Sequence, residues 1–119
     1  MAFYSDYKNV LVDMKDGITT VTLNRPEKRN AMSPDLEEEM LDCILNLEGD
    51  RDTHVLILTG AGSAWCAGMD LDLFFRDLEG NPDNAVKYVR AEWAGHQWKW
   101  HRLYNFPKPT IAMVNGYCF

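Results

Sequence analysis

One glycine- and alanine-rich stretch, residues 60–71, has a composition suited to holding a reactive group. It follows an apolar run at residues 55–59, which predicts a buried strand, and it precedes residues 71–78, which predict a helix. Small residues let the backbone approach a ligand closely, and a helix start presents free N–H groups and a positive dipole end. Such a turn can hold a developing negative charge, although an ordinary strand-to-helix loop has the same composition.

A second feature is the cluster of cations at Arg25, Lys28 and Arg29 in an otherwise acidic chain of net charge −6. The overall charge disfavours nucleic acid as a partner, but a local cluster can still bind an anionic small ligand. The three histidines have no spaced cysteine or acidic partners, so no metal site is predicted. Cys66 lies beside the glycine-rich stretch without a histidine placed to activate it, and it is interpreted as a small packed residue.

The composition bounds the class of protein. A chain of 119 residues is long enough for about one domain, and 46% hydrophobic with 25% charged residues is ordinary for a soluble globular protein. No apolar run approaches the roughly 20 residues of a membrane span, and no signal peptide is visible at the N-terminus. The odd number of cysteines, three, argues against a closed disulfide framework and favours a reduced, cytoplasmic location.

The elements that would position these residues alternate between strand and helix. Asp16-Gly17 is a hairpin signal, Ser33-Pro34 a helix start and Gly49 a plausible helix stop. The patterns predict strands at residues 10–14, 18–23, 55–59 and 110–114 and helices at 34–49, 70–78 and 83–104. We therefore expect an α/β fold with a largely parallel sheet flanked by helices.

The same patterns predict which faces are buried. The continuous apolar run at residues 55–59 suits a central strand covered on both faces. In the first helix the predicted core positions are Leu36, Met40, Ile44 and Leu47, and residues 37–39, all glutamates, are placed on the solvated face. In the long helix the predicted apolar stripe consists of Val86, Val89, Trp93, Trp100 and Leu103, widened by Trp98 and Tyr104.

Four segments together resemble the crotonase (enoyl-CoA hydratase/isomerase) superfamily: residues 23–31, 55–60, 67–70 and 108–116, in matching order along nearly the whole chain. Within it, the match is closest to the hydroxycinnamoyl-CoA (feruloyl-CoA) hydratase/lyases. That match is carried by residues 30–34, 58–62, 67–71, 97–100 and 112–119. The resemblance implies that residues 1–119 are the N-terminal part of a single crotonase-like domain with ββα repeats.

The resemblance also assigns roles. The Met69 N–H is similar to an oxyanion-hole donor for the thioester carbonyl, and Lys28 and Ala31 match the loop over the coenzyme A phosphates and adenine. Arg29 is a further nearby cation for those phosphates. The implied backbone contacts to coenzyme A come from Ala67, Gly68, Asp70 and Leu71. The implied substrate is an acyl-CoA thioester, with no separate cofactor and no metal, and the implied assembly is a homo-oligomer, a trimer or hexamer.

Two departures from the family pattern matter. Family members run to more than twice this length, so the chain resembles a truncated piece that lacks the second oxyanion donor and the general acid/base glutamate. The hydratase/lyases also carry a tyrosine where this chain has Phe74, which keeps an aromatic wall but loses the hydroxyl. The sequence thus leaves open the exact acyl group and whether cleavage follows hydration.

Three other interpretations stay open. One is a plain enoyl-CoA hydratase or isomerase acting on aliphatic acyl groups. Another is a nucleotide-binding module, although Trp65 stands where a dinucleotide fingerprint needs its third glycine. The third is a catalytically inactive fragment or interaction module.

Overall fold

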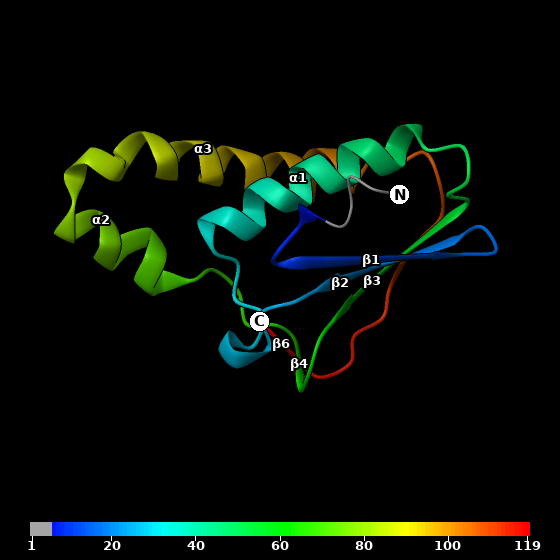
Figure 1. The fold of residues 1–119 in the computed structure, drawn as a ribbon, viewed down its shortest axis with the longest axis horizontal. Coiled ribbons are helices and arrows are strands. Elements are labelled where there is room, and N and C mark those ends of the chain that lie inside the picture. The colour runs from blue at the N-terminus through cyan, green and yellow to red at the C-terminus, as the bar shows by residue number, and fades with distance from the viewer. Residues whose placement is uncertain (1–5) are drawn as a thin grey trace.

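A four-stranded sheet with helices along one side forms the framework of the molecule (Figure 1). The computed structural model describes residues 6–119, with the side chains of residues 78 and 79 excepted. The described part measures 46 × 28 × 26 Å. Two long helices, α1 (Pro34–Gly49) and α3 (Ala85–His96), pack against each other above the strands (Figure 1).

The sheet is mostly parallel, as predicted. Its strand order is β1-β2-β3-β5, where β1 (Val10–Lys15) and β2 (Ile18–Leu23) form an antiparallel hairpin. Strand β3 (Val55–Gly60) runs parallel to β2 and to β5 (Thr110–Ala112), which makes it central. The hairpin turn uses positive φ at Asp16 (52°) and Gly17 (82°), the geometry that a tight two-residue hairpin requires.

The central position of β3 is confirmed, but its coverage is one-sided. Leu56 and Leu58 are buried under the helices, whereas Val55 and Ile57 on the opposite side are half-buried. Strand β5 is shorter than predicted and exposed along its length, because it is the outer strand of this sheet. The prediction that residues 55–59 are covered on both faces is therefore wrong for the described residues.

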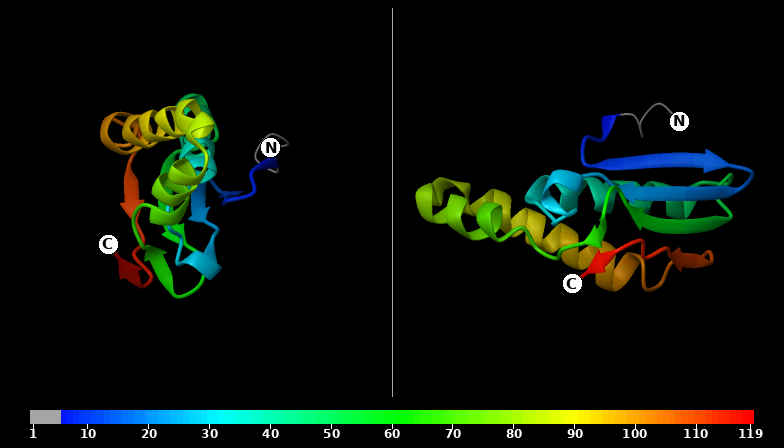
Figure 2. Two further views of the ribbon diagram at one scale, coloured as in Figure 1. Left: turned by 90° about the vertical axis from the view of Figure 1, so that its left-hand side faces the viewer. Right: turned by 90° about the horizontal axis from the view of Figure 1, so that it is seen from below.

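A second, two-stranded sheet was not predicted. It pairs β4 (Ala64–Cys66) in parallel with β6 (Tyr117–Cys118) and lies beyond the ends of β3 and β5 (Figure 2). It brings the glycine-rich stretch next to the last residues of the chain. A two- or three-residue strand is too short to show an alternating pattern in sequence, so no signal marked it.

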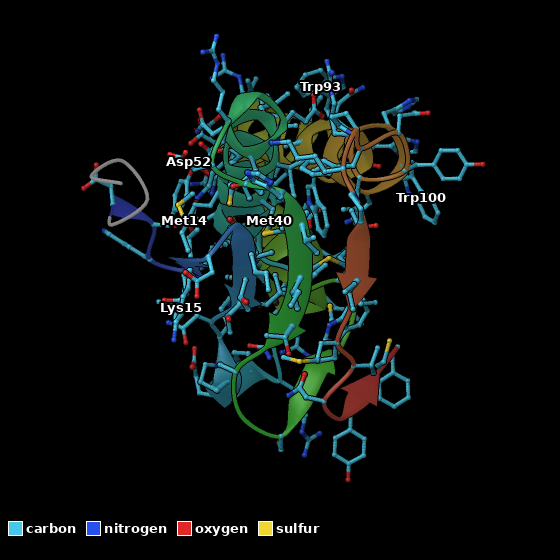
Figure 3. All side chains as sticks on the ribbon, turned by 90° about the vertical axis from the view of Figure 1, so that its right-hand side faces the viewer. Met14, Lys15, Met40, Asp52, Trp93 and Trp100 are labelled. Atoms are coloured by element: carbon cyan, nitrogen blue, oxygen red, sulfur yellow. The ribbon has the colours of Figure 1, made fainter. Side chains whose placement is uncertain are left out.

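The core lies between α1 and the sheet. Ser33 caps α1 by accepting a hydrogen bond from the Leu36 N–H (3.2 Å), and Pro34 occupies the first helical position. Met40 points from α1 toward the strands (Figure 3). The four predicted core residues of α1 are all fully buried: Leu36, Met40, Ile44 and Leu47.

The helical region after β4 is divided into short pieces. It comprises a π-helical turn η3 (Asp72–Arg76), α2 (Asp77–Gly80), a 3-10 turn η4 (Pro82–Asn84), then α3 and the π-helical segment η5 (Gln97–Arg102). The helices predicted at residues 70–78 and 83–104 are thus present. Among residues 6–119, none of the helices has the length and apolar character that crossing a membrane requires.

Two burial predictions are wrong. Glu37 is not on the solvated face of α1; it is 3% exposed and pairs with Lys99 of η5 at 2.7 Å. On α3 the buried residues are Tyr88, Ala91, Ala94 and Gly95, so the face with the small residues packs inward. The reason is close helix packing, since a Cβ on Gly95 would lie 1.5 Å from Glu37 Oε2. Of the predicted stripe, Trp98 is buried and Leu103 packs against the core, as expected. The exposed members are Val86, Val89, Trp93, Trp100 and Tyr104. Figure 3 shows Trp93 and Trp100 pointing away from the sheet.

Candidate functional site

The glycine-rich loop after β3 is held by two asparagines distant in sequence. Asn30, which is fully buried, donates to the carbonyls of Ala61 and Ala64, each at 2.9 Å. Asn115 donates to the Gly60 carbonyl (2.9 Å) and accepts from the Gly60 N–H (3.2 Å). A Cβ at Gly60 would lie 2.5 Å from two carbonyl oxygens, so only glycine fits there. The loop is therefore a rigid structure.

The turn at residues 67–70 is hydrogen-bonded to the loop at residues 29–32. Ala67 N–H donates to the Arg29 carbonyl (2.9 Å), and Asp70 N–H donates to the Met32 carbonyl (3.0 Å). The Met32 N–H in turn donates to the Gly68 carbonyl (2.7 Å). Gly68 has φ of +96°, a conformation that glycine adopts at no steric cost. These bonds fix the orientation of the peptide that carries the Met69 N–H.

The Met69 N–H is the donor of interest because it makes no hydrogen bond to any residue in the described part of the chain. The N–H groups of Ala67, Gly68 and Asp70 are all engaged, that of Gly68 with Cys66 Sγ at 3.4 Å. The side chain of Met69 is 40% exposed, which places this turn at the surface. A fixed, unpaired N–H is the arrangement that stabilises a developing oxyanion without reorganisation.

Asp70 joins this turn to the following helix. Its Oδ1 accepts from the Leu73 N–H (3.1 Å) and its carbonyl accepts from the Phe74 N–H (3.1 Å), so the helical region starts directly after the Met69 turn. Its Oδ2 forms a buried ion pair with Arg25 Nη1 at 3.0 Å. The Asp70 carboxylate thus has a structural role, and its carbonyl is engaged in the first turn of the helical region.

The ion pair between Asp70 and Arg25 shows that the predicted cluster of three ligand-binding cations is wrong at Arg25. Arg25 is 8% exposed and also donates to the Ala31 carbonyl, so it is not available to an external anion. Lys28 and Arg29 are exposed on and after the 3-10 turn η2 (Pro26–Lys28). Two of the three predicted cations therefore remain accessible, beside the half-buried Ala31.

Phe74 lies one helical turn beyond Asp70 and lines a cavity of about 200 Å³. Its ring is 6% exposed and its centroid is 6.1 Å from that of Tyr88 on α3. Leu71, by contrast, is 66% exposed at the start of the helix. The cavity is formed by Met69, Phe74 and Phe75 on one side and by Ala85, Tyr88, Val89 and Glu92 on the other. It therefore extends from the Met69 turn toward α3.

Nucleophilic chemistry has little support in this region. Cys66 is buried, and that burial raises the pKa of its thiol, so it stays protonated near neutral pH. Within residues 6–119 no group of three or more His, Cys, Asp or Glu side chains is placed to hold a metal ion. The site offers a backbone donor, surface cations and an apolar cavity.

The predicted site residues thus come together. Lys28, Arg29 and Ala31 lie on one loop, residues 67–71 lie on the turn bonded to it, and Phe74 follows on the helix. The sequence assigned no role to Asn30, Asn115, Tyr88 or Glu92, although both asparagines lie in segments that carry the family resemblance. For Asn30 a signal existed, since asparagine tolerates the left-handed conformation it adopts (φ 59°).

Comparisons with known proteins identify the fold and the family. Residues 13–119 match the family model described as enoyl-CoA hydratase/isomerase. The chain is 53% identical over 113 residues to a hydroxycinnamoyl-CoA hydratase-lyase of Pseudomonas fluorescens, covering 95% of this chain and 40% of that protein. It is also 35% identical to a 1,2-epoxyphenylacetyl-CoA isomerase of Escherichia coli, and that match covers 90% of this chain and 40% of the isomerase.

Solved structures agree. An enoyl-CoA hydratase/isomerase from Mycobacterium paratuberculosis superposes with a TM-score of 0.76 at 26% identity, covering 93% of this chain and 43% of that one. The chain therefore spans about two fifths of the length of the relatives it matches.

Proposed function

Because this chain belongs to the enoyl-CoA hydratase/isomerase family, we propose that it supplies the acyl-CoA binding loop and one oxyanion donor of a hydroxycinnamoyl-CoA hydratase/lyase. The full-length enzyme adds water across the double bond of an acyl group such as feruloyl, and then cleaves the adduct. The products are an aromatic aldehyde and acetyl-CoA, and no separate cofactor or metal takes part.

The observation that carries the proposal is the unpaired Met69 N–H on a turn whose neighbouring N–H groups are all used. In the hydration step, water oxygen bonds to the β-carbon while the thioester carbonyl becomes an enolate, which a proton at the α-carbon then quenches. In the cleavage step the β-hydroxyl loses its proton, the bond between α- and β-carbons breaks, and an enolate forms again. Both steps place negative charge on the carbonyl oxygen, and an oriented N–H stabilises it there.

The coenzyme A end is assigned to the loop beside this turn. Lys28 and Arg29 are exposed, and lysine and arginine are suited to phosphate oxygens. Ala31, Ala67, Gly68, Asp70 and Leu71 are assigned to the backbone wall along which the rest of coenzyme A lies. Because the N–H groups of Ala67 and Asp70 are engaged, their contacts are assigned to carbonyl oxygens, at Asp70 through the lone pair that the Phe74 N–H does not use.

The aromatic acyl group is supported by the cavity and by the relatives. A cavity of roughly 150 Å³ lined by apolar side chains holds benzene, so one of about 200 Å³ between Phe74 and α3 has room for an aryl ring. The relative at 53% identity is named for a hydroxycinnamoyl substrate. Hydration of an aliphatic enoyl-CoA is the second candidate, and the loss of a hydroxyl at Phe74 favours it.

The test is an assay of the protein encoded by the complete natural reading frame. We expect loss of the feruloyl-CoA absorbance with stoichiometric formation of aldehyde and acetyl-CoA, and slower turnover of crotonyl-CoA. Hydration of crotonyl-CoA with no aldehyde from feruloyl-CoA would support the aliphatic candidate and overturn the lyase assignment.

A further inference from the structure

Two of the three cysteines lie opposite each other where β4 pairs with β6. Cys66 of β4 and Cys118 of β6 are direct partners in the parallel ladder (Figure 2). The Phe119 N–H donates to the Cys66 carbonyl (3.0 Å) at the same point, which fixes the pairing. Both cysteines are free thiols in this structure. Because directly paired residues have side chains on the same face of a sheet, the ladder brings the two thiols together.

The backbone spacing at this pair is the spacing that a disulfide needs. Neighbouring strands lie about 4.7–4.9 Å apart, and disulfides join Cα atoms that are about 4.4–6.8 Å apart. The charges of the two groups also interact. Burial is the largest cause of the raised pKa of the Cys66 thiol, and the neighbouring Cys118 raises it further. A bond between the two sulfur atoms therefore requires little movement of either strand.

The two thiols differ in their access to solvent. Cys118 is exposed, so a dissolved oxidant reaches it, whereas Cys66 is 7% exposed and lies beside it on the next strand. An accessible cysteine next to a second, resolving cysteine is the usual arrangement of a thiol that is oxidised reversibly. Cys118 is thus placed to react first and Cys66 to complete the disulfide.

We propose that Cys66 and Cys118 form a reversible disulfide that cross-links β4 to β6 when the protein meets a peroxide. Hydrogen peroxide oxidises the Cys118 thiol to a sulfenic acid and is reduced to water. Cys66 then gives up its proton, its sulfur bonds to the Cys118 sulfur, and the sulfenic oxygen leaves as a second water. Disulfides in reducing compartments are usually transient in this way, and thiol exchange reverses them.

The disulfide is connected to the Met69 turn through Gly68. Cys66 Sγ accepts a hydrogen bond from the Gly68 N–H (3.4 Å), and the Gly68 carbonyl accepts one from the Met32 N–H (2.7 Å). Gly68 also precedes Met69 directly in the chain. Movement of Sγ toward Cys118 weakens the bond to the Gly68 N–H, so oxidation changes the orientation of the turn.

The test treats the full-length protein with hydrogen peroxide, blocks the remaining thiols with iodoacetamide and maps linked peptides by mass spectrometry. We expect a Cys66–Cys118 link that dithiothreitol removes and that neither Cys66→Ser nor Cys118→Ser can form. Cys43→Ala is the matched control and should keep the link, because Cys43 is fully buried on α1. If Cys66 and Cys118 are instead oxidised or alkylated separately, or Cys118 is linked to another cysteine, the proposal is wrong.

A second measurement tests the effect on the Met69 turn, and this part rests on the proposed function. Peroxide should lower kcat several-fold in the unaltered enzyme, and dithiothreitol should restore it. Cys118→Ser should be active and insensitive to peroxide. A mapped disulfide with unchanged kcat would overturn the effect on the turn. A protein that turns over neither feruloyl-CoA nor crotonyl-CoA would overturn the proposed function, while the peptide map would still decide whether the disulfide forms.

Discussion

At the scale of single residues, Met69 is distinguished by its backbone and not by its side chain. Its N–H is unpaired within residues 6–119, while the side chain is 40% exposed and can vary. We therefore expect Met69→Ala in the full-length enzyme to retain most activity. Met69→Pro removes the donor and should lower kcat by about 10²–10³, the usual effect of losing one oxyanion donor.

Because proline also restricts the backbone, the variant's folding is checked by thermal melting and by coenzyme A binding. A folded, coenzyme A-binding Met69→Pro enzyme that turns over as fast as Met69→Ala would place the oxyanion hole elsewhere. The turn at residues 67–70 would then be only a connection between β4 and the helix.

The proposed phosphate contacts of Lys28 and Arg29 lead to a second prediction, because the phosphates of coenzyme A are remote from the reacting carbons. Such contacts would stabilise the ground state and the transition state equally, so removing them should raise KM and leave kcat nearly unchanged. Both side chains are exposed, and exposed pairs contribute about 1 kcal/mol or less each, so the double alanine variant should raise KM roughly tenfold. Steady-state kinetics at low and high salt measure this, and a large fall in kcat at saturation would contradict it.

The residues that hold the candidate site together were harder to predict than those proposed to act in it. The roles proposed for Met69 and Lys28 came from the family resemblance of two short segments, each of them continuous in sequence. Asn30 and Asn115 instead join segments between 31 and 55 positions apart through amide hydrogen bonds. Sequence patterns report periodicity and local turn chemistry, and a side-chain bond between two loops leaves no such pattern.

At the scale of elements, the strands and helices were predictable because they are long and strongly patterned. Strand β3 and helix α1 match their predicted spans to within one residue. The prediction of which face of α3 packs inward was wrong. This helix has two faces able to pack, one with small residues such as Ala91 and Gly95 and one with large side chains such as Trp93. Close approach to α1 selects the small face, and that depends on a tertiary contact to Glu37.

The pairing of α1 with η5 gives a pH-dependent prediction. Burial raises the pKa of Glu37 above its ordinary 4.5, and Lys99 acts in the opposite direction. Lys99 contacts only Oε2, and Oε1 has no hydrogen-bond partner within the described region. A raised folded pKa means that the folded state binds more protons, so this contribution to stability is present below pH 4.5 and is lost as pH rises.

We expect Glu37→Gln to gain stability relative to the unaltered full-length protein as pH rises above 4.5, with a slope of up to about 1.4 kcal/mol per pH unit. Urea unfolding at several pH values measures this. Glu38→Gln, at the exposed neighbour, is the matched control. The opposite slope would show that the ion pair with Lys99 outweighs burial.

At the scale of the whole molecule, the described chain exposes many large apolar side chains on neighbouring parts of its surface. The outward face of α3 and η5 presents Val86, Val89, Trp93 and Trp100, all between 58% and 66% exposed. Beyond β5 the edge of the sheet is unpaired in the described structure, and Ile111, Met113 and Val114 are about half exposed. Open edges and broad apolar faces both promote association.

We therefore expect the 119-residue chain, expressed alone, to self-associate. Because the free energy comes from buried apolar area, at about 25 cal/mol per Å², two large side chains should dominate it. Light scattering after size exclusion should find assemblies that shrink when Trp93 and Trp100 are both replaced by lysine. The matched control is Leu11→Lys with Ile18→Lys, at exposed positions on the strands of the hairpin. If the unaltered chain is a monomer that melts cooperatively, the expectation is wrong. If the tryptophan pair and the hairpin pair of substitutions shrink the assemblies equally, association depends on apolar surface in general and not on the α3 face.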